Sequence, residues 1–335
     1  MQLKRLVLRA DGSSAIGMGH VMRCMALAQM LKQELLIGFA IHEPDSAVKQ
    51  MMANAQIPLM EIPTRLDTGY AADFDAIVLD GYWFDNEYVQ ALKAMGKKVI
   101  QIDDFAGREF FADLVLNHAL NVDYSASVFH GGRLLAGSRY ALLRQEFLDP
   151  PPATQRTGLK TLLLNMGGAD PANYTLRLLE AIQNTQHPWS AICVIIGSAY
   201  PHGEALSAFV SSHPDLNIEV KSSLSASGMA ALMAEASLFI CPASTVAYEA
   251  MAVKVPMACF MTADNQKNIY EGLLAAQAVL GLGDISRQNG QELKHSVEMA
   301  FSNFSLALSY LRHQEQLIDG RSGERIRQEV LSLWN

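Results

Sequence analysis

Short apolar runs alternate with stretches of helical spacing along the whole chain, and this alternation limits the fold more than any other feature. In the first half, the strand-like runs are Leu6–Leu8, Leu35–Ala40, Ala76–Leu79, Lys98–Ile102 and Leu114–Leu116. In the second half they are Lys160–Leu164, Ala191–Ile196, Leu238–Cys241 and Pro256–Phe260. Helical spacing marks Val21–Leu31, Ala172–Ile182, Met229–Ala234 and Val246–Ala252. Because parallel strands need a crossover between them, this order predicts βαβ units and an α/β fold.

The chain is expected to divide into two such domains. Its 335 residues, half of them apolar, exceed what a single core usually holds. Three successive prolines follow Asp149 and cannot donate ladder or helix hydrogen bonds, so we expect the boundary there. The predicted parts are residues 1–148, a linker at 149–158, residues 159–317, and a terminal helix at 318–335 that packs back on the first domain. Two helices are expected from Ser302 onward.

Two doubly wound, Rossmann-like parallel sheets are the predicted architecture. Open sheets of this kind bind ligands at the carboxyl ends of their strands. Two of them are therefore expected to face a common cleft.

Charge and cysteine usage exclude several classes of partner. The net charge of −8 is spread without a basic stripe, which argues against nucleic acid, so an anionic ligand must be held mainly by backbone N–H groups and helix N-termini. Cys24, Cys193, Cys241 and Cys259 stand singly, which favours buried thiols in a reducing cytosol over disulfides or zinc. No apolar run approaches the ~20 residues of a membrane span. We therefore expect a cytoplasmic protein that binds neither nucleic acid nor membrane.

A glycine-rich turn, Ile16-Gly-Met-Gly-His20, joins the first strand to the first helix. Gly17 and Gly19 let a ligand approach the backbone, although such turns use glycine without a ligand as well. His20 stands at the helix N-terminus, where the dipole disfavours an imidazolium and leaves a neutral ring able to accept a proton. A general base and a merely capping histidine are both consistent with this position. The other histidines lack such a setting and are interpreted as surface or structural groups.

A second turn, Asn165–Asp170, precedes a helix that Asp170 is expected to cap, with Pro171 as its first residue. Its paired glycines, Gly167 and Gly168, either admit phosphate oxygens or simply close the turn.

A third turn places Ser244 and Thr245 at another helix start, where they can bind an anion or only cap the helix. Glu249 follows one turn later on the face of Thr245. Its carboxylate can hold a ribose diol or remain a solvated charge.

These turns belong to a larger set of motifs that resembles one known family. The motifs are Arg9-Ala-Asp11, Ile16–Cys24, Leu79-Asp-Gly-Tyr82, Asp103-Asp104, Leu114–Asn117, Met166–Asp170, Ala243–Ala250 and Asp264-Asn-Gln266. The family is the UDP-sugar hydrolases of pseudaminic acid biosynthesis, which remove UDP from UDP-2,4-diacetamido-2,4,6-trideoxy-β-L-altropyranose. The resemblance implies a GT-B fold related to the N-acetylglucosaminyltransferase that completes the peptidoglycan lipid precursor. That transferase has a doubled Gly-Gly-x-Gly-Gly-His turn, so the simpler turn here favours the hydrolase.

The resemblance also implies a role for each matching residue. His20 would be the base that acts on water. The substrate side would comprise Asp11, Gly17, Gly19, Tyr82, Asn265 and Gln266. The UDP side would comprise Gly167, Gly168, Met229, Ser244, Thr245 and Glu249, with the Met229 backbone at uracil and Glu249 at ribose. Tyr248 replaces a smaller polar residue of some members, which leaves that wall of the pocket undefined.

The adjacent carboxylates of Asp103 and Asp104 do not match a metal site, because neighbouring strand residues point to opposite faces. A loop-shaping or substrate-hydroxyl role is expected instead. The predicted reaction is an inverting, metal-independent and cofactor-free hydrolysis by a monomer that yields UDP and a free sugar. A GT-B transferase using a UDP-amino sugar and a non-catalytic nucleotide-sugar binding protein are the alternatives, and the second would not need His20.

Overall fold

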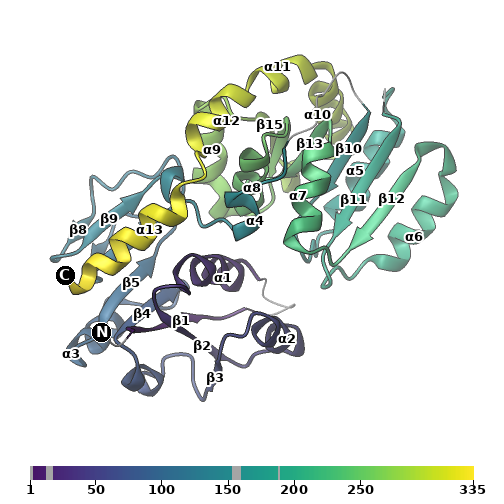
Figure 1. Cartoon of the computed structure of the whole chain (residues 1–335). Helices are drawn as coiled ribbons and strands as arrows, with labels where there is room; N and C mark the ends of the chain where they lie inside the picture. The colour runs from purple at the N-terminus through teal and green to yellow at the C-terminus, as the bar shows by residue number, and fades with distance from the viewer. Residues whose placement is uncertain (1–2, 13–17, 153–159, 188) are drawn as a thin grey trace. The chain divides into compact units, whose positions relative to one another are not determined.

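The computed structural model describes residues 3–12, 18–152, 160–187 and 189–335. The chain forms two compact units, one of Met1–Gln145 with Arg321–Asn335 and one of Glu146–Gly320. Each unit is built on a parallel sheet with helices on both faces (Figure 1). The predicted α/β class with two doubly wound, Rossmann-like sheets is confirmed. Most of the predicted linker lies outside the described residues.

The first unit contains a seven-stranded sheet in the order β3-β2-β1-β4-β5-β7-β9. Its strands are β1 (Arg5–Ala10), β2 (Leu36–His42), β3 (Leu59–Ile62), β4 (Ala76–Asp80), β5 (Lys98–Ile102), β7 (Leu114–Asn117) and β9 (Arg133–Ala136). The central register sets Leu8 opposite Phe39 on one side and Val78 on the other. A separate short ladder joins β6 (Glu109–Phe110) to β8 (Val128–Phe129).

Helices cover both faces of this sheet because alternate strand residues point to opposite sides. They are α1 (Gly19–Leu31), α2 (Ser46–Asn54), α3 (Asn86–Ala94) and α13 (Ser322–Leu331), with short 3₁₀ segments η1 (Gly69–Asp73), η2 (Ser138–Tyr140) and η6 (Ser332–Trp334). Val7, Ile77 and Val99 share a core with η1 and α3. α1 contacts β1, and α13, from the far end of the chain, packs against α1 and η2.

The second unit contains a six-stranded sheet in the order β12-β11-β10-β13-β14-β15. Its strands are β10 (Thr161–Asn165), β11 (Ala191–Ile196), β12 (Ile218–Ser222), β13 (Leu238–Pro242), β14 (Met257–Met261) and β15 (Leu280–Asp284). Its helical segments are α5 (Tyr174–Gln183), α6 (Gly203–Ser212), α7 (Ala226–Glu235), α8 (Thr245–Val253), α9 (Lys267–Ala275), α10 (Gly290–Ser302), α11 (Phe304–Ser309), α12 (Leu311–Leu317), η3 (Pro214–Leu216), η4 (Asp264–Gln266) and η5 (Ile285–Arg287). The chain passes from the first unit to the second within the short α4 (Gln145–Leu148).

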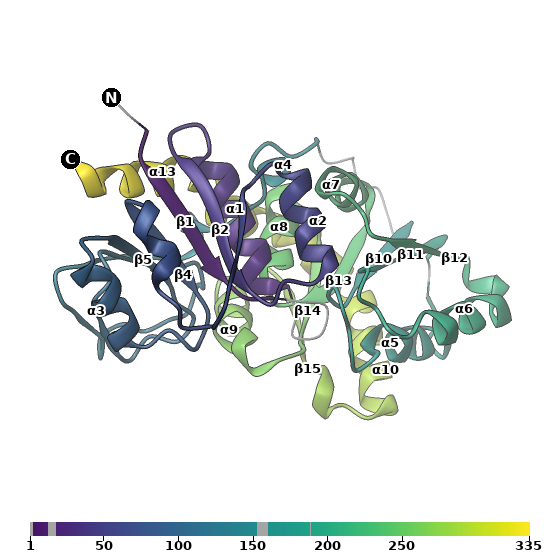
Figure 2. The ribbon, with the colours of Figure 1, turned by 90° about the horizontal axis from the view of Figure 1, so that it is seen from below.

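One face of the second sheet carries the main core of that unit. Leu162 and Leu164 of β10 pack there with apolar residues of α5 and α10, and Figure 2 shows these two helices side by side. On the other face, α8 contacts β13 and α7.

Two expectations about helices differ from the structure. The fully described stretch after Ser302 holds three helices, α11, α12 and α13, rather than two. The helical path is interrupted at Tyr310, between α11 and α12, and again after α12, where Gly320 takes a φ of +74° before α13. α5 begins at Tyr174 and is flanked by Asn173 in the left-handed region, so Asp170 is not its N-cap residue.

Candidate active site

The strand order of the first sheet creates a switch point between β1 and β4. The chain leaves β1 toward β2 and β3 on one side and returns to β4 on the other side of β1. In open parallel sheets, ligands bind outside the carboxyl ends of the strands at such a point. Here the loop after β1 leads into His20 on α1, and β4 ends at Asp80.

His20 and Asp80 form a short hydrogen bond at this point. His20 is the second residue of α1, and its Nδ1 lies 2.6 Å from Oδ1 of Asp80. Because an ionised carboxylate only accepts hydrogen bonds, the proton of this bond is on Nδ1. In the neutral ring, Nε2 therefore carries the free lone pair. The His20 side chain is 19% exposed, whereas that of Asp80 is fully buried.

Asp80 is held in turn by Arg23, which lies one turn after His20 on α1. The Arg23 guanidinium donates through Nε to Oδ2 of Asp80 at 2.5 Å and through Nη2 to Oδ1 at 2.6 Å. Burial alone would raise the pKa of Asp80, but the charge and hydrogen bonds of Arg23, with those of His20, hold it below its usual value. Asp80 is therefore an ionised, bidentately fixed acceptor for His20.

The same guanidinium reaches a second carboxylate, that of Asp104. Nη1 donates to Oδ1 of Asp104 at 2.7 Å, and Nη2 donates to Oδ2 at 3.0 Å. Burial opposes ionisation of Asp104, but Arg23 outweighs it and lowers the pKa to about 2. We call Arg23, Asp80 and Asp104 the ion cluster. The ion cluster holds one positive and two negative charges, a net charge of −1. When His20 takes up a proton, the charge of the ion cluster and His20 together becomes zero.

Tyr82 links the ion cluster back to His20. Its hydroxyl donates to Oδ2 of Asp104 at 2.9 Å. Its ring meets the His20 ring edge to face, with centroids 4.9 Å apart. The structure thus brings together the predicted residues Gly19, His20 and Tyr82, whereas Gly17 lies outside the described residues.

Asp11, also assigned to the substrate, is occupied by protein groups. It is buried and forms a two-point ion pair with the fully buried Arg9. It also accepts from Nε of Arg65 at 3.2 Å and from the backbone N of His42 at 2.9 Å. The structure therefore gives the Asp11 carboxylate an anchoring role at the end of β1, where it ties this strand to the end of β2 and to Arg65.

Asp103 and Asp104 have separate tasks, as expected for adjacent residues that point apart. Asp103 accepts from the backbone N of Ala106 at 2.9 Å, from Arg108 at 2.7 Å and from the Tyr124 hydroxyl at 2.8 Å, so it shapes the loop after β5. Asp104 belongs to the ion cluster. Across the described part of the chain, no group of three or more His, Cys, Asp or Glu residues is arranged to hold a metal ion.

The second sheet has a switch point of the same kind between β10 and β13. Gly167 and Gly168 follow β10, and Ser244 follows β13 and precedes α8. Gly167 takes a φ of +103°, and a Cβ on either of these two glycines would meet no atom within 4 Å. Ser244 makes no side-chain capping bond, and Thr245 is the first residue of α8. The loop after β13 thus offers backbone and hydroxyl groups at the N-terminus of α8, the setting in which anions bind, whereas the loop after β10 offers the backbone of two glycines ahead of α5.

Asp170 closes the loop after β10 differently from the prediction. It has a φ of +40°, and its carboxylate accepts from the backbone N of Tyr174 and of Thr175, both at 2.8 Å. The side chain therefore satisfies the first N–H groups of α5 from outside the helix. Because Asp170 and Asn173 both adopt left-handed backbone, the chain makes an extra turn before α5 starts.

Two residues assigned to the nucleoside are more enclosed. Met229 lies within α7, is buried, and donates its backbone N–H to the carbonyl of Ser225 at 2.9 Å. Its N–H is therefore already used by the helix. Glu249 is 5% exposed within α8. Tyr248 beside it is fully buried and belongs to the packing of that helix.

Asn265 and Gln266 lie in η4, at the carboxyl end of β14. The Gln266 side chain makes two hydrogen bonds of 2.9 Å to Thr262, one to its backbone N and one to its hydroxyl. Gln266 therefore braces its own loop, whereas Asn265 is exposed.

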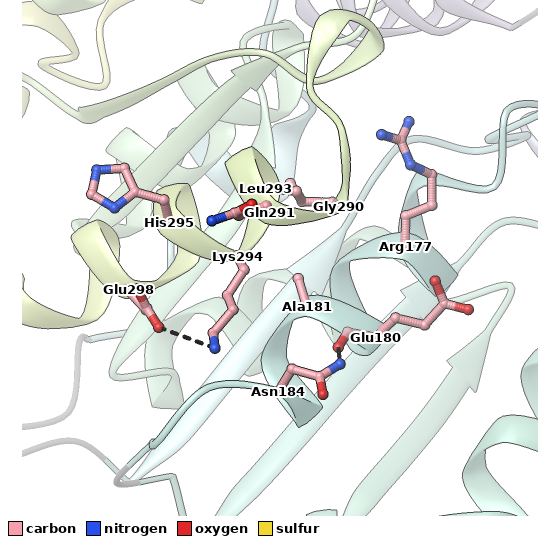
Figure 3. A pocket seen from close by; sticks show the side chains of 10 residues that line it. All are labelled: Arg177, Glu180, Ala181, Asn184, Gly290, Gln291, Leu293, Lys294, His295 and Glu298. Atoms are coloured by element: carbon pink, nitrogen blue, oxygen red, sulfur yellow. Dashed lines mark hydrogen bonds and ion pairs between the residues drawn. The ribbon is translucent and has the colours of Figure 1, made fainter.

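A groove of about 660 Å³ lies elsewhere on the second unit. It runs between α5 and α10 and is lined by charged or polar groups such as Glu180, Asn184, Lys294 and Glu298 (Figure 3). Arg177 at its end already donates to the carbonyls of Ile285 and Gln288. This groove is formed by helix flanks, so it does not coincide with either switch point.

Comparison with solved structures identifies the fold. The fold is of the GT-B type, as in MurG from Acinetobacter baumannii, which superposes with a TM-score of 0.67 at 15% identity over 98% of this chain and 99% of that one. No family model matches the chain.

Among curated proteins, the chain is 25% identical to the spore coat polysaccharide biosynthesis protein SpsG of Bacillus subtilis, over 95% of each chain. It is 24% identical to the UDP-2,4-diacetamido-2,4,6-trideoxy-β-L-altropyranose hydrolase of Campylobacter jejuni, over 79% of this chain and 94% of that one. The resemblance inferred from the turn motifs is confirmed.

Asp80 and Arg23 were not assigned a role from the sequence alone, and Asp104 was expected to shape a loop or bind a substrate hydroxyl rather than to pair with Arg23. Two signals were available. Arg23 follows His20 by three residues, which places both side chains on one face of a helix. Asp80 and Asp104 each stand at or just after the end of a buried strand, where parallel strands present their side chains to a common edge. What the sequence could not give was the strand order, in which β4 lies beside β1 and β5 lies beside β4.

Proposed function

We propose that the protein is an enzyme of nucleotide-sugar metabolism that hydrolyses a UDP-linked 2,4-diacetamido-2,4,6-trideoxy sugar. The observation that carries this proposal is the 2.6 Å bond between His20 and the buried Asp80. A carboxylate that fixes the ring and favours its protonated form is what a histidine needs to act as a general base. The similarity to the Campylobacter hydrolase supports the same substrate class.

In the proposed reaction, Nε2 of His20 takes a proton from water as the water oxygen attacks the anomeric carbon. The bond between that carbon and the UDP oxygen breaks, and its electron pair leaves with UDP. The Asp80 carboxylate stabilises the imidazolium, which returns its proton to solvent after product release. Attack from the face opposite UDP gives inversion.

The diphosphate is assigned to the second switch point. Backbone N–H groups near Gly167 and Gly168 and the N-terminus of α8 supply its hydrogen bonds and favourable dipole. These groups are present before the reaction, so they stabilise the departing charge without reorganisation.

The proposal is tested by carrying out the reaction in ¹⁸O-labelled water and determining which product carries the label. Cleavage at the anomeric carbon places the label in the free sugar and leaves UDP unlabelled, with the inverted anomer seen first by NMR. UMP with a sugar phosphate, or label in the nucleotide, would contradict the proposal. UDP release that begins only after a sugar or lipid acceptor is added would identify a transferase instead.

A further inference from the structure

The two most exposed aromatic side chains in the described part of the chain lie together beside His20. Tyr82 is 50% exposed and Phe105 is 55% exposed, whereas the other exposed large apolar residues are aliphatic. The Tyr82 and Phe105 rings have centroids 5.2 Å apart. Tyr82 also contacts the His20 ring at 4.9 Å.

Phe105 is held outward by the loop after β5. Asp104, the residue before it, is fixed by Arg23, while Ala106 after it adopts a φ of +58° and donates to Asp103 at 2.9 Å. Gly107 continues this turn with a φ of +70°. The ring is therefore fixed at both of its chain neighbours, although more than half of its surface is open to water.

The exposed Phe105 ring does not contribute to the packing of the unit, since Phe105 belongs to neither core described above. A clustered pair of exposed aromatic rings is characteristic of ligand contact, because burying them against a partner releases water from a large apolar area. The neighbouring groups, His20 and the Tyr82 hydroxyl, are polar, so the ligand must present an apolar surface next to hydroxyl or amide groups.

We propose that Tyr82 and Phe105 form an apolar platform that receives the C–H face and the C6 methyl group of the glycosyl unit. This inference rests on the proposed function, whose sugar already lacks a hydroxyl at C6, and assigns recognition of that position to Tyr82 and Phe105. A sugar with a hydroxyl on C6 would set that hydroxyl against the two apolar ring faces, which offer it no hydrogen bond, and this disfavours it. Phe105 is the residue that determines this preference.

Phe105→Ala tests the platform without touching the ion cluster, because its ring carries no polar atom. We expect the wild-type kcat/KM to favour a 6-deoxy UDP-sugar over its 6-hydroxy counterpart by at least about tenfold. In Phe105→Ala, kcat/KM for the 6-deoxy sugar is expected to fall by about ten- to a hundredfold and the preference to fall below about threefold. Inhibition by the product UDP is expected to stay unchanged, because UDP is assigned to the other unit.

Leu36→Ala is the matched control, since Leu36 is 50% exposed at the start of β2, away from the carboxyl end of the sheet. It is expected to retain both rate and preference. The proposal is overturned if the wild type shows no 6-deoxy preference, or if Phe105→Ala keeps the rate and preference of the wild type.

A binding measurement separates this proposal from the proposed hydrolysis. If the wild type releases no UDP from either sugar, the proposed function fails, and saturation-transfer NMR with free 2,4-diacetamido-2,4,6-trideoxyhexose then tests the platform by itself. Saturation of its C6 methyl signal by the wild type and its loss in Phe105→Ala support the platform. Equal saturation in both proteins, or none in either, overturns it.

Discussion

At the scale of single residues, the orientation of one imidazole ring decides what the site can do. A histidine at a helix start is common, and the helix dipole alone disfavours its protonation. The Asp80 carboxylate acts in the opposite sense, since it stabilises the imidazolium that forms when Nε2 accepts a proton. The proposed base therefore depends on a residue that is fully buried and would touch no substrate.

His20→Asn and Asp80→Asn are each expected to lower kcat by at least about a hundredfold with a small change in KM. An asparagine at 80 preserves the size of the side chain but not the charge that orients the ring. The double variant is expected to lose little more than the His20 variant, because the two residues act as a unit. Steady-state kinetics with UDP detection measures all three.

Circular dichroism and UDP affinity serve as controls for folding of these variants. Additive losses in the double variant would show that Asp80 acts independently of His20. Turnover of His20→Asn within a few-fold of the wild type would remove the base assignment.

His118 gives a stability prediction that depends on pH. It is buried just after β7, and burial, with the nearby charge of Arg23, lowers its pKa to about 4. In the unfolded chain its pKa is about 6.5, so between these values the unfolded state binds more protons. The free energy of unfolding therefore falls as the pH drops from about 6.5 to about 4, with a slope of up to about 1.4 kcal/mol per pH unit from this residue.

His118→Gln is expected to remove that part of the slope. Urea unfolding between pH 7.5 and 4 measures it, and the value at pH 7.5 serves as the reference for any loss of packing. Asp104 contributes in a lower window, because its lowered pKa gives stability that is lost as the pH falls from about 4 toward about 2. An unchanged slope above pH 4 in His118→Gln would contradict this account.

At the scale of elements, the interior strands were predictable and the edges were not. The predicted runs correspond to β1, β2, β4, β5, β7, β10, β11, β13 and β14, which are continuous apolar segments. The four unpredicted strands of the two sheets, β3, β9, β12 and β15, are the edge strands. Residues there alternate between burial and exposure irregularly, as in β12, whose five residues are all partly or fully exposed. An edge strand has a neighbour on one side only, so its sequence needs less apolar character.

For the candidate site too, local features were predictable from the sequence and contacts between distant segments were not. His20 and the glycine turns were predicted because short motifs mark strand-to-helix turns, and Tyr82 was predicted from the family resemblance. The ion cluster was missed because its members come from α1, β4 and the loop after β5, and their meeting depends on strand order. For the paired aspartates, the local rule that adjacent residues point apart was enough to predict separate roles, and Asp103 has the loop-shaping contacts that were expected of one of them.

The loop after β10 gives a prediction at this scale. A Cβ on Gly197, which follows β11, would lie 2.1 Å from the carbonyl oxygen of Gly168. Gly197→Ala must therefore displace the Gly167–Gly168 loop, at a typical overpacking cost of about 1–3 kcal/mol. Affinity for UDP, measured by calorimetry, is expected to fall by about tenfold or more.

Gly203→Ala is the matched control, because a Cβ there meets no atom within 4 Å and Gly203 begins α6. It is expected to bind UDP as the wild type does. Equal affinity of Gly197→Ala and Gly203→Ala would show that the loop after β10 does not contact the nucleotide.

At the scale of the whole molecule, each unit has its own sheet, its own core and its own switch point. None of the helices among the described residues has the length and apolar character to cross a membrane. The net charge of −8 makes general electrostatic attraction of an anionic ligand unfavourable. Binding of a nucleoside diphosphate therefore has to rely on local dipoles.

We accordingly expect UDP release to continue at an undiminished rate in EDTA. The proposed diphosphate site meets negative charge with backbone N–H groups and the N-terminus of α8, which a chelator does not remove. Initial rates with and without EDTA, and after addition of magnesium or manganese, measure this. Loss of activity in EDTA that magnesium restores would require a different account of how the diphosphate is held.

The ion cluster also ties chemistry to the completion of folding. His20 meets its orienting carboxylate 60 residues further along the chain, and Arg23 meets Asp104 across 81 residues. A growing polypeptide on the ribosome therefore has no activated histidine until α1, β4 and the loop after β5 have assembled. Under the proposed function, immature chains would therefore spare the cell's pool of activated sugars. The onset of turnover during refolding would then report docking of these distant segments rather than formation of α1 alone.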